Sequence, residues 1–264
     1  MNSIEKQMVE ILIEMKEKYH VTGVKAEFEA EGTRIDEAMR LKEIAMNSGI
    51  SFNLKIGGCE AIRDLFDAIK LGTERIIAPM VESPYALQKF LIAAKKHLVD
   101  QDMELFINLE TITACNNFDK MLDLPEIAEL SGIVIGRVDL AGSLGRDRTV
   151  IDIDPTIKAL CLQMAAKANQ HGLKVVVGGA ITSSSLPFLQ SFPVGHLDRF
   201  ETRKVMFNCP MALDNPIAAF NKAIEFELLW LKNKKNYYGK IYTEDDLRIT
   251  MIEKRLDLEP KSAH

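Results

Sequence analysis

The chain has 264 residues, of which 47% are hydrophobic and 27% are charged, and its formal net charge is −5. A single α/β barrel commonly takes about 250 residues, so this length suits one large domain. A net negative charge lacks the basic footprint of a nucleic-acid-binding protein, so we expect no nucleic-acid partner. No run of the sequence approaches the roughly 20 apolar residues of a membrane span, so we expect no membrane partner either.

The first residues and the cysteines indicate the compartment. Residues 1–20 carry acids and bases every few positions and lack the unbroken apolar core of a signal peptide. The cysteines are dispersed and form no CxxC pair, which argues against disulfides and against structural zinc. We therefore expect a reduced, cytoplasmic protein.

From residue 23 to residue 207, short β-rich apolar runs alternate with longer amphipathic patterns. The expected strands are residues 23–28, 51–56, 75–81, 104–109, 132–138, 174–177 and 199–207. The helical patterns between them include residues 35–47, 60–71, 85–97 and 155–171. This alternation is typical of right-handed βαβ units around a parallel sheet. About seven such units favour a (β/α)8-type TIM barrel with one atypical or missing strand.

The C-terminal segment has a different pattern. We expect residues 1–215 to form the barrel and residues 216–264 to form a helical extension, either part of the same domain or an oligomerisation element. A break at residues 237–239 and a capping box at Thr243 predict a last helix over residues 244–256. The face expected to cover the barrel consists of Ile217, Phe220, Ile224, Leu228 and Leu231.

Trp230 lies off the centre of that face. On a monomer it would leave an exposed apolar patch, so we expect a homo-oligomer built partly through these helices. The alternative is that the helices simply cap the barrel.

Acidic residues stand at the ends of two neighbouring strands, where the active site of a parallel barrel forms. The run ELFINLE ends in Glu110, and alternation places Asn108 on the same side. The run GIVIGRVDL ends in Asp139, with Arg137 expected on its side. Two carboxylates at the mouth predict a site for Mg²⁺ or Mn²⁺. Strand-end acids also serve as helix caps or in loop salt bridges, so the pattern alone leaves both interpretations open.

Four segments carry a resemblance to a known family: NLETITACNN, SGIVIGRVDLAGSLG, APMVES and LKIGGCEAI. They resemble the HpcH/HpaI aldolase and citrate lyase β-subunit superfamily, the phosphoenolpyruvate/pyruvate-binding barrels, over roughly residues 21–208. The Glu-Thr pair followed by Gly-x-x-Asp-Leu is the most specific part. The resemblance implies an aldolase or carbon–carbon lyase that stabilises the enolate of pyruvate, oxaloacetate or a related 2-oxoacid.

The resemblance also implies roles for individual residues. Glu110 and Asp139 would ligate the divalent metal, and the backbone amides of Val138 and Asp139 would receive the substrate carboxylate. Family members commonly exchange the C-terminal region between subunits, which again favours a homo-oligomer. The other residues expected to bind the substrate are Gly136, Gly57, Gly58, Asn108 and Arg203.

Two departures from the family concern charge and acid–base chemistry. The family's enolate-binding residue is usually Arg, but Lys55 stands at the matching position and supplies a point charge without a bidentate fork. The alternative is that Lys55 forms an ion pair with Glu27 or Glu29 across the barrel. The aldolase branch has an acid–His pair where VKAEFEAEG offers only acids, so we expect Glu27 or Glu29 as the acid/base, with a pKa raised by burial. Pairing with Lys25 is the structural alternative.

A third departure is Arg137, where the family usually has a small or apolar residue, or an acid. Near the metal it could clamp a second carboxylate or a phosphate. Arg203 could face the same mouth or pair with Glu201.

Two alternatives to the lyase therefore stay open: an enzyme using phosphoenolpyruvate or another phosphorylated substrate, and a non-catalytic barrel that binds a metabolite. The sequence does not name the electrophile.

Overall fold

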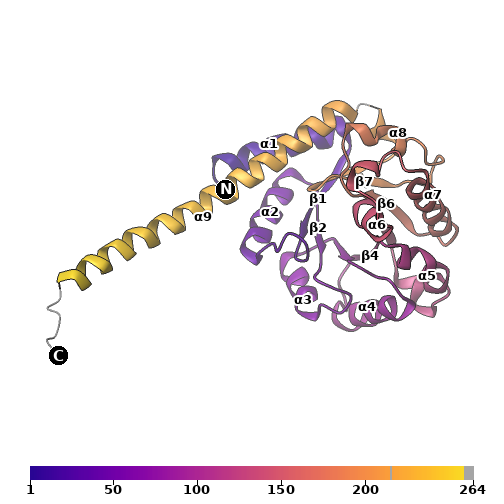
Figure 1. The fold of residues 1–264 in the computed structure, drawn as a ribbon, viewed down its shortest axis with the longest axis horizontal. Coiled ribbons are helices and arrows are strands. Elements are labelled where there is room, and N and C mark those ends of the chain that lie inside the picture. The colour runs from indigo at the N-terminus through magenta and orange to yellow at the C-terminus, as the bar shows by residue number, and fades with distance from the viewer. Residues whose placement is uncertain (215, 259–264) are drawn as a thin grey trace.

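A computed structural model describes residues 1–214 and 216–258. Within these residues, eight strands close into one barrel in chain order, and helices surround it (Figure 1). The strands are β1 Val21–Glu27, β2 Ser51–Lys55, β3 Arg75–Ala78, β4 Glu104–Leu109, β5 Gly132–Gly136, β6 Lys174–Gly178, β7 Arg199–Glu201 and β8 Val205–Asn208. The predicted (β/α)8-type barrel is therefore confirmed.

Most helices follow a strand and cover the outside of the barrel (Figure 1). The α-helices are α1 Ser3–Tyr19, α2 Ile35–Ser48, α3 Ile62–Leu71, α4 Pro84–His97, α5 Ile112–Leu122, α6 Arg137–Ser143, α7 Pro155–Gln170, α8 Leu186–Leu189 and α9 Pro216–Leu258. Short 3-10 helices are η1 Pro125–Glu129, η2 Arg148–Val150, η3 Ser183–Ser185 and η4 Met211–Leu213. No helix in the described part of the chain is long and apolar enough to cross a membrane.

The eighth strand, which the sequence did not predict, is the second strand of a β-hairpin. Residues 199–207 were expected as one strand, but the chain turns back after Glu201 and forms β8. Strands β1 to β7 pair in parallel, whereas β8 is antiparallel to both β7 and β1. The last strand therefore closes the barrel without a crossover helix, because an antiparallel neighbour needs only a short turn.

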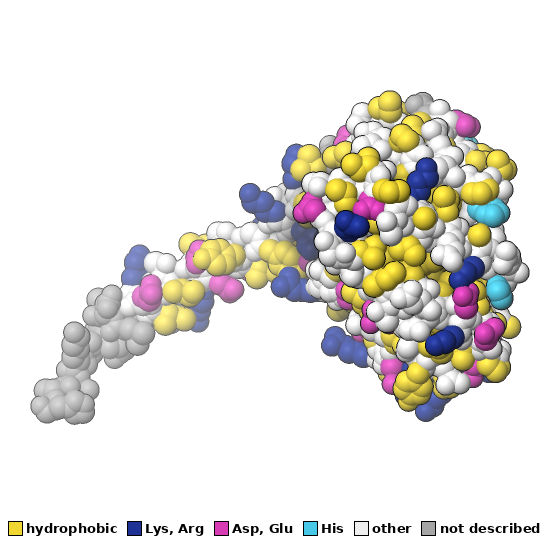
Figure 2. Space-filling model, turned by 45° about the vertical axis from the view of Figure 1, so that its right-hand side comes forward, with side chains coloured by type: hydrophobic (Ala, Val, Ile, Leu, Met, Phe, Trp, Pro, Cys, Tyr) yellow, Lys and Arg dark blue, Asp and Glu magenta, His cyan; other side chains and the backbone are white. Residues whose placement is uncertain are grey.

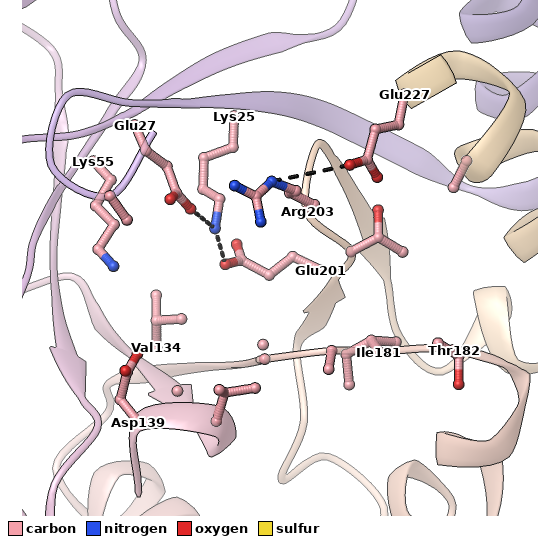
Figure 3. A pocket seen from close by; sticks show the side chains of 18 of the residues that line it. Lys25, Glu27, Lys55, Val134, Asp139, Ile181, Thr182, Glu201, Arg203 and Glu227 are labelled. Atoms are coloured by element: carbon pink, nitrogen blue, oxygen red, sulfur yellow. Dashed lines mark hydrogen bonds and ion pairs between the residues drawn. The ribbon is translucent and has the colours of Figure 1, made fainter. Parts of the chain in front are cut away.

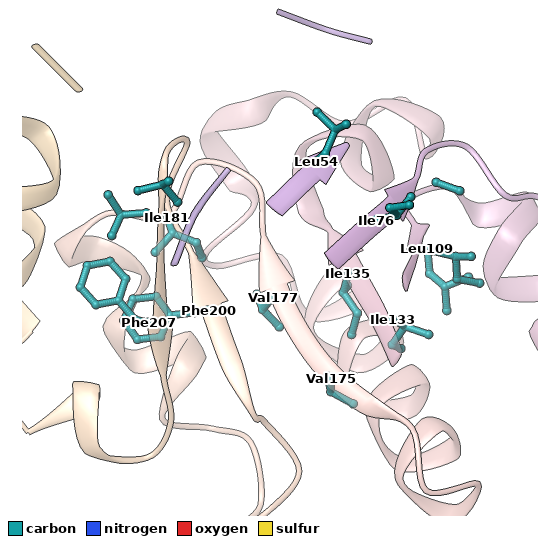
Figure 4. Close-up of a cluster of buried hydrophobic side chains, with 14 of the residues drawn as sticks. Leu54, Ile76, Leu109, Ile133, Ile135, Val175, Val177, Ile181, Phe200 and Phe207 are labelled. Atoms are coloured by element: carbon teal, nitrogen blue, oxygen red, sulfur yellow. The ribbon is translucent and has the colours of Figure 1, made fainter. Parts of the chain in front are cut away.

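Apolar side chains pack on both sides of the strands. Those pointing outward, such as Leu54, Ile135 and Val177, are buried against the helices (Figure 4). Those pointing inward form a separate buried layer inside the barrel. This layer consists of Ile77, Phe106, Val134, Val176 and Met206. The barrel interior is thus a packed core, and only its C-terminal end is free for a site.

Strand β5 is shorter than the sequence predicted. It ends at Gly136, and helix α6 begins at the next residue, without a side-chain cap. The alternation expected over residues 132–138 therefore stops two residues early. Arg137 and Asp139 consequently follow helical geometry and point in different directions, although they were expected on one side.

Helix α9 is continuous through residues 237–239, so the predicted break there is wrong. A helix tolerates an interior glycine such as Gly239 at a cost of about 1 kcal/mol. The buried face of α9 also differs from the prediction. Phe220 and Trp230 are 3% exposed, whereas Ile224 is 61% and Leu231 is 53% exposed. The apolar stripe of the prediction mostly faces away from the barrel.

Polar contacts fix α9 beside α1 and α2. The amide of Asn233 accepts a hydrogen bond from Asn2 at 2.7 Å, and the Tyr238 hydroxyl donates to Glu37 at 2.5 Å. Beyond Tyr238 the helix projects away from the barrel (Figure 1). Only the first half of α9 therefore packs against the rest of the protein.

Candidate active site

A cavity of about 490 Å³ opens at the C-terminal ends of the strands, above the inner apolar layer. Val134 forms part of its floor, and α9 contributes Ile224 and Glu227 to its wall (Figure 3). Its charged and amide side chains are Lys25, Glu27, Lys55, Asn108, Glu110, Asp139, Arg148, Glu201, Arg203, Asn221 and Glu227. The site predicted at this end of the barrel thus corresponds to a real cavity.

Glu110 directly follows β4 and is 2% exposed. Its Oε1 accepts a hydrogen bond from the Met80 amide at 2.9 Å, and its Oε2 accepts one from Asn108 Nδ2 at 2.7 Å. Burial raises the pKa of Glu110, and the nearby Asp139 charge adds to this, against the lowering effect of Lys55. A Cβ on Gly136 would lie 2.8 Å from Oε2, so glycine is needed there.

Asp139 lies in the first turn of α6, exposed to the cavity. The amides of the first turn of a helix have no acceptor within that helix. The Val138 and Asp139 amides therefore remain available at the cavity, as the resemblance requires. Gly136, which also lines the cavity, brings the start of α6 against Glu110.

Lys55, the last residue of β2, is 7% exposed and lies between two acids. Its Nζ is 3.1 Å from Glu29 Oε2 and 3.8 Å from Glu110 Oε2. Burial acts to lower the pKa of Lys55, but the charges of Glu110, Glu27 and Glu29 raise it overall. The ammonium therefore stays protonated. The ion pair with Glu29 that the sequence left open is present, and it places this charge beside Glu110.

A second charged group adjoins Lys55, because Glu27 and Lys55 are register partners at the ends of β1 and β2. Lys25 Nζ is 2.8 Å from Glu27 Oε1 and 2.5 Å from Glu201 Oε1, which joins the ends of β1 and β7 (Figure 3). Burial acts to lower the pKa of Lys25, but both carboxylates raise it overall. Burial alone would raise the pKa of Glu27, yet the charge and hydrogen bond of Lys25 lower it. The raised pKa expected for Glu27 is therefore wrong.

Arg203 lies at the rim of the cavity, on the turn between β7 and β8. Its Nε is 3.1 Å from Glu31 Oε1 and 3.9 Å from Glu227 Oε1 of α9. The structure places Arg203 at the mouth, and the alternative partner Glu201 pairs with Lys25 instead. Arg203 thus ties the hairpin to α9 above the cavity.

Arg137 does not face the cavity, which corrects the expected clamp. Its side chain is fully buried, and Nη1 donates to Asp152 Oδ1 at 2.6 Å. Nη2 donates to the carbonyl of Gly179 at 2.9 Å, and the guanidinium lies 4.5 Å from the centre of the Phe188 ring. Neither Asp152 nor Phe188 lines the cavity, and Arg137 itself does not line it, because helix α6 starts one residue after β5 ends. Arg137 is a structural residue behind the cavity wall.

Gly57 and Gly58 also lie away from the site. The Gly57 amide donates to Asp64 Oδ2 at 2.7 Å, which orients the loop before α3, and neither glycine lines the cavity. Lys55 is the last residue of this segment to reach the cavity, since the chain leaves the barrel mouth immediately after it.

The oxygen groups beside Glu110 suit a hard divalent cation. The described residues contain no group of three His, Cys, Asp or Glu side chains able to hold a metal. Mg²⁺ typically uses one or two carboxylates and keeps several waters, so Glu110 and Asp139 are sufficient. Asn108 Oδ1 is buried and accepts no hydrogen bond from the residues that the structure describes, and a cation would relieve the repulsion between the two carboxylates. The residues fit the metal that the resemblance implies.

The fold and this arrangement of carboxylates define a class: α/β barrels with a polar site at the C-terminal ends of the strands. No protein-family model and no curated protein matches the sequence. Solved structures do match. An HpcH/HpaI aldolase/citrate lyase family protein from Burkholderia cenocepacia J2315 superposes with a TM-score of 0.61, at 10% identity, covering 90% of each chain.

Two further structures agree. An HpcH/HpaI aldolase from Desulfitobacterium hafniense DCB-2 has a TM-score of 0.57 and 14% identity, covering 72% of this chain and 79% of its own. The citrate synthase SbnG has a TM-score of 0.54 and 15% identity, covering 95% of this chain and 90% of its own. At such low identities the likeness shows a common fold.

The sequence missed the Lys25–Glu201 pair, whose members lie 176 residues apart. Lys25 was noted only as a partner of Glu27, and Glu201 only as a partner of Arg203. The signal available was that each is a charged residue within or at the end of a short β-rich run. Such residues are expected to reach the barrel mouth.

Proposed function

We propose that this chain belongs to the HpcH/HpaI aldolase and citrate lyase group. In this proposal it is a divalent-metal-dependent carbon–carbon lyase or aldolase acting on pyruvate or a related 2-oxoacid. The main support for this proposal is that Glu110, Asp139 and Lys55 line one cavity at the C-terminal ends of the strands. The likeness to solved aldolase structures supports the same assignment.

Each residue has a role that follows from its position. Glu110 and Asp139 would hold Mg²⁺ or Mn²⁺, and the bound cation supplies Lewis-acid stabilisation of enolate charge. The free amides of Val138 and Asp139 are donors for the substrate carboxylate. The Lys55 ammonium, held protonated by three acids, lies beside Glu110 and favours negative charge on an enolate oxygen.

The acid–base group of the aldolase branch has no histidine counterpart in this cavity among the described residues. Glu27 is kept ionised by Lys25, so it suits the role of a base better than that of an acid. Glu29 is held by Lys55 and does not line the cavity, which leaves it as a positioning residue.

The alternative of a phosphorylated substrate has less support from the structure than it had from the sequence. Of the residues that motivated it, Arg137 and the Gly57–Gly58 pair lie away from the cavity, whereas Lys55 and the Gly178–Gly179 pair line it. Arg148 lines the cavity and forms no ion pair among the described residues, so it could meet an anion at the rim. The non-catalytic alternative does not explain why the buried Glu110 and the exposed Asp139 line one cavity.

One experiment separates these functions. Mg²⁺ or Mn²⁺ is titrated calorimetrically into metal-free protein, alone and with pyruvate or phosphoenolpyruvate. In parallel, exchange of the pyruvate methyl protons in D2O is followed by NMR. The proposal predicts metal binding, tighter binding of pyruvate with metal, and metal-dependent exchange. If pyruvate neither binds nor exchanges with either metal, the proposal fails, and selective binding of phosphoenolpyruvate would favour the alternative.

A further inference from the structure

Three charged side chains meet near the C-terminal ends of β1 and β7. Lys25 Nζ lies 2.8 Å from Glu27 Oε1 and 2.5 Å from Glu201 Oε1, so one ammonium bridges two carboxylates (Figure 3). All three side chains line the cavity, and Lys25, Glu27 and Glu201 are only 7%, 9% and 4% exposed. Ionisable groups that are desolvated and paired in a cleft are candidates for acid–base chemistry.

Glu27 is the carboxylate of this group that is better placed for a substrate. Its register partner on β2 is Lys55, whose Nζ lies 3.8 Å from Glu110 Oε2. The side chain of Glu27 is 12% exposed, whereas that of Glu201 is 5% exposed. A ketoacid held at Glu110 would therefore meet Glu27, and Glu201 would remain behind Lys25.

Glu201 keeps the charge of Lys25 paired when Glu27 becomes neutral. A carboxylate that takes a proton loses its charge, and a buried ammonium with that single partner would be left unpaired at a high cost. Lys25 would still have Glu201 Oε1 as a partner. A Cβ on Gly178, at the end of β6, would lie 3.0 Å from this oxygen, so glycine leaves room for the carboxylate against β6.

Two further cations lie near Glu27, and each has a carboxylate of its own. Lys55 pairs with Glu29 at 3.1 Å, and Lys204 pairs with Glu31. Burial acts to raise the pKa of Glu27, but the ammonium bonded to it, and then these two cations, lower it overall. Glu27 is therefore ionised at neutral pH and able to accept a proton.

We propose that Glu27 is the base that removes the C3 proton of the ketoacid, and that Lys25 and Glu201 are its positioning residues. This inference rests on the proposed function and assigns the proton transfer in it. Glu27 takes the proton, the electrons of the C3–H bond form the C2–C3 double bond, and the carbonyl π electrons move to the oxygen to give the enolate. In D2O the acid proton of Glu27 exchanges with solvent, and reversal returns a deuteron to C3.

The first experiment titrates Glu27 in metal-free protein without substrate. Carboxyl signals of ¹³C-labelled glutamate are followed by NMR, and the Glu27 signal is assigned from its loss in Glu27→Gln. In Lys25→Met the burial remains but the ammonium is gone, so the Glu27 midpoint should move up by about one pH unit or more. In Glu201→Gln the ammonium serves one carboxylate only, so the midpoint should not rise. A general loss of packing would not separate the two variants in this way.

The second experiment follows exchange of the pyruvate methyl protons in D2O with Mg²⁺ or Mn²⁺. Glu27→Gln should slow exchange by about a hundredfold or more, with pyruvate affinity within about threefold, because a base acts in the reaction step. In Lys25→Met the fall of the exchange rate at low pH should begin at a higher pH, in step with the NMR midpoint. Glu104→Gln is the matched control, since Glu104 also pairs with a buried cation, Arg75, but at the start of β4. It should leave rate and pH profile unchanged.

If Lys25→Met does not fold, the double variant Lys25→Met with Glu201→Gln removes one charge of each sign and should still raise the Glu27 midpoint. Near-normal exchange in folded Glu27→Gln, or a Glu27 midpoint that stays unchanged without Lys25, would overturn the inference while the proposed function stands. Absence of exchange in the wild-type protein would instead contradict the proposed function, and the assignment of Glu27 as its base with it.

Discussion

At the scale of single residues, the site depends on a close approach between Glu110 and Gly136. The carboxylate is desolvated, accepts two hydrogen bonds and has its pKa raised by burial and by Asp139. Only the absence of a Cβ at Gly136 leaves room for Oε2. Burying a carboxylate in this way costs folding free energy unless a ligand compensates its charge. Buried carboxylates with shifted pKa values are common in functional sites.

The first prediction concerns the two carboxylates. Glu110→Gln and Asp139→Asn should each lower metal-dependent turnover by about a hundredfold or more, because each removes a charge that holds the cation. Circular dichroism should show an unchanged fold. Glu227→Gln, at the cavity rim, should leave metal affinity within about twofold, since it lies across the cavity from Asp139 (Figure 3). Near-normal turnover of a Glu110 or Asp139 variant in EDTA would contradict the metal assignment.

Arg137 shows how a residue beside a metal ligand can be purely structural. Its guanidinium is buried among the Asp152 carboxylate, two backbone carbonyls and the Phe188 ring. Burial acts to raise the pKa of Asp152, but hydrogen bonds from Arg137 and neighbouring serines lower it overall. Removing one partner of such a pair leaves the other charge buried and unpaired.

The second prediction is a pH-dependent loss of stability in Asp152→Asn. The folded pKa of Asp152 lies below its ordinary value, so its stabilising effect is complete above about pH 4 and fades as pH falls through the folded pKa. Urea unfolding at pH 7 should show a loss of roughly 1–3 kcal/mol. The difference should shrink below pH 4. The exposed Asp102→Asn control should show no difference, and a gap that persists at pH 2 would contradict the ion-pair explanation.

The sequence identified Glu110, Asp139 and Lys55 because they follow strands, and strand ends meet at the barrel mouth. It placed Arg137 wrongly because alternation was carried past the end of β5. Nothing local marks that end, since Gly136 supplies no side-chain cap. Glu201 was overlooked because its partner lies on β1, and pairing over such a separation depends on closure of the barrel.

At the scale of elements, the β7–β8 hairpin is the main departure from prediction. The turn residues Thr202, Arg203 and Lys204 include no Gly, Pro, Asn or Asp, so the run read as one strand. The turn is instead held by the Thr202 amide and hydroxyl bonded to the Val205 carbonyl, and by Lys204 paired with Glu31. These contacts come from tertiary structure, and residue pattern alone does not reveal them.

The third prediction tests the continuity of α9 at Gly239. A Cβ there would meet no atom within 4 Å, so alanine fits. Gly239→Ala should raise helix content and increase the stability of the helix by about 0.5–1 kcal/mol, because alanine is less flexible when unfolded. Helix content is measured by far-ultraviolet circular dichroism, with Gly239→Pro as the opposite control. If alanine lowers helix content, the helix is interrupted at residue 239, as the sequence suggested.

At the scale of the whole molecule, α9 divides into a half that completes the barrel and a half that leaves it (Figure 1). Phe226 and Trp230 are buried against the barrel. A chain ending near residue 215 would therefore expose the core, and its loss of solubility would say nothing about assembly. Hydrophobic side chains continue along the projecting half (Figure 2). They include Tyr242, Leu247, Ile249 and Ile252.

The last prediction is that this surface joins copies of the chain into a homo-oligomer. Leu228 and Leu231 are 49% and 53% exposed, and at helical spacing they continue from Ile224, which lines the cavity, toward the projecting half of α9. A contiguous apolar stripe of this kind on a long helix is typical of an interface. The double variant Leu228→Lys with Leu231→Lys should therefore shift the molar mass measured by light scattering toward the monomer. Its melting temperature should change little, because neither side chain belongs to the core. Ile153→Lys, at a side chain 79% exposed in the loop between η2 and α7, should leave the mass unchanged. If the wild-type chain is already monomeric at micromolar concentration, α9 has no partner helix and the stripe is simply solvated.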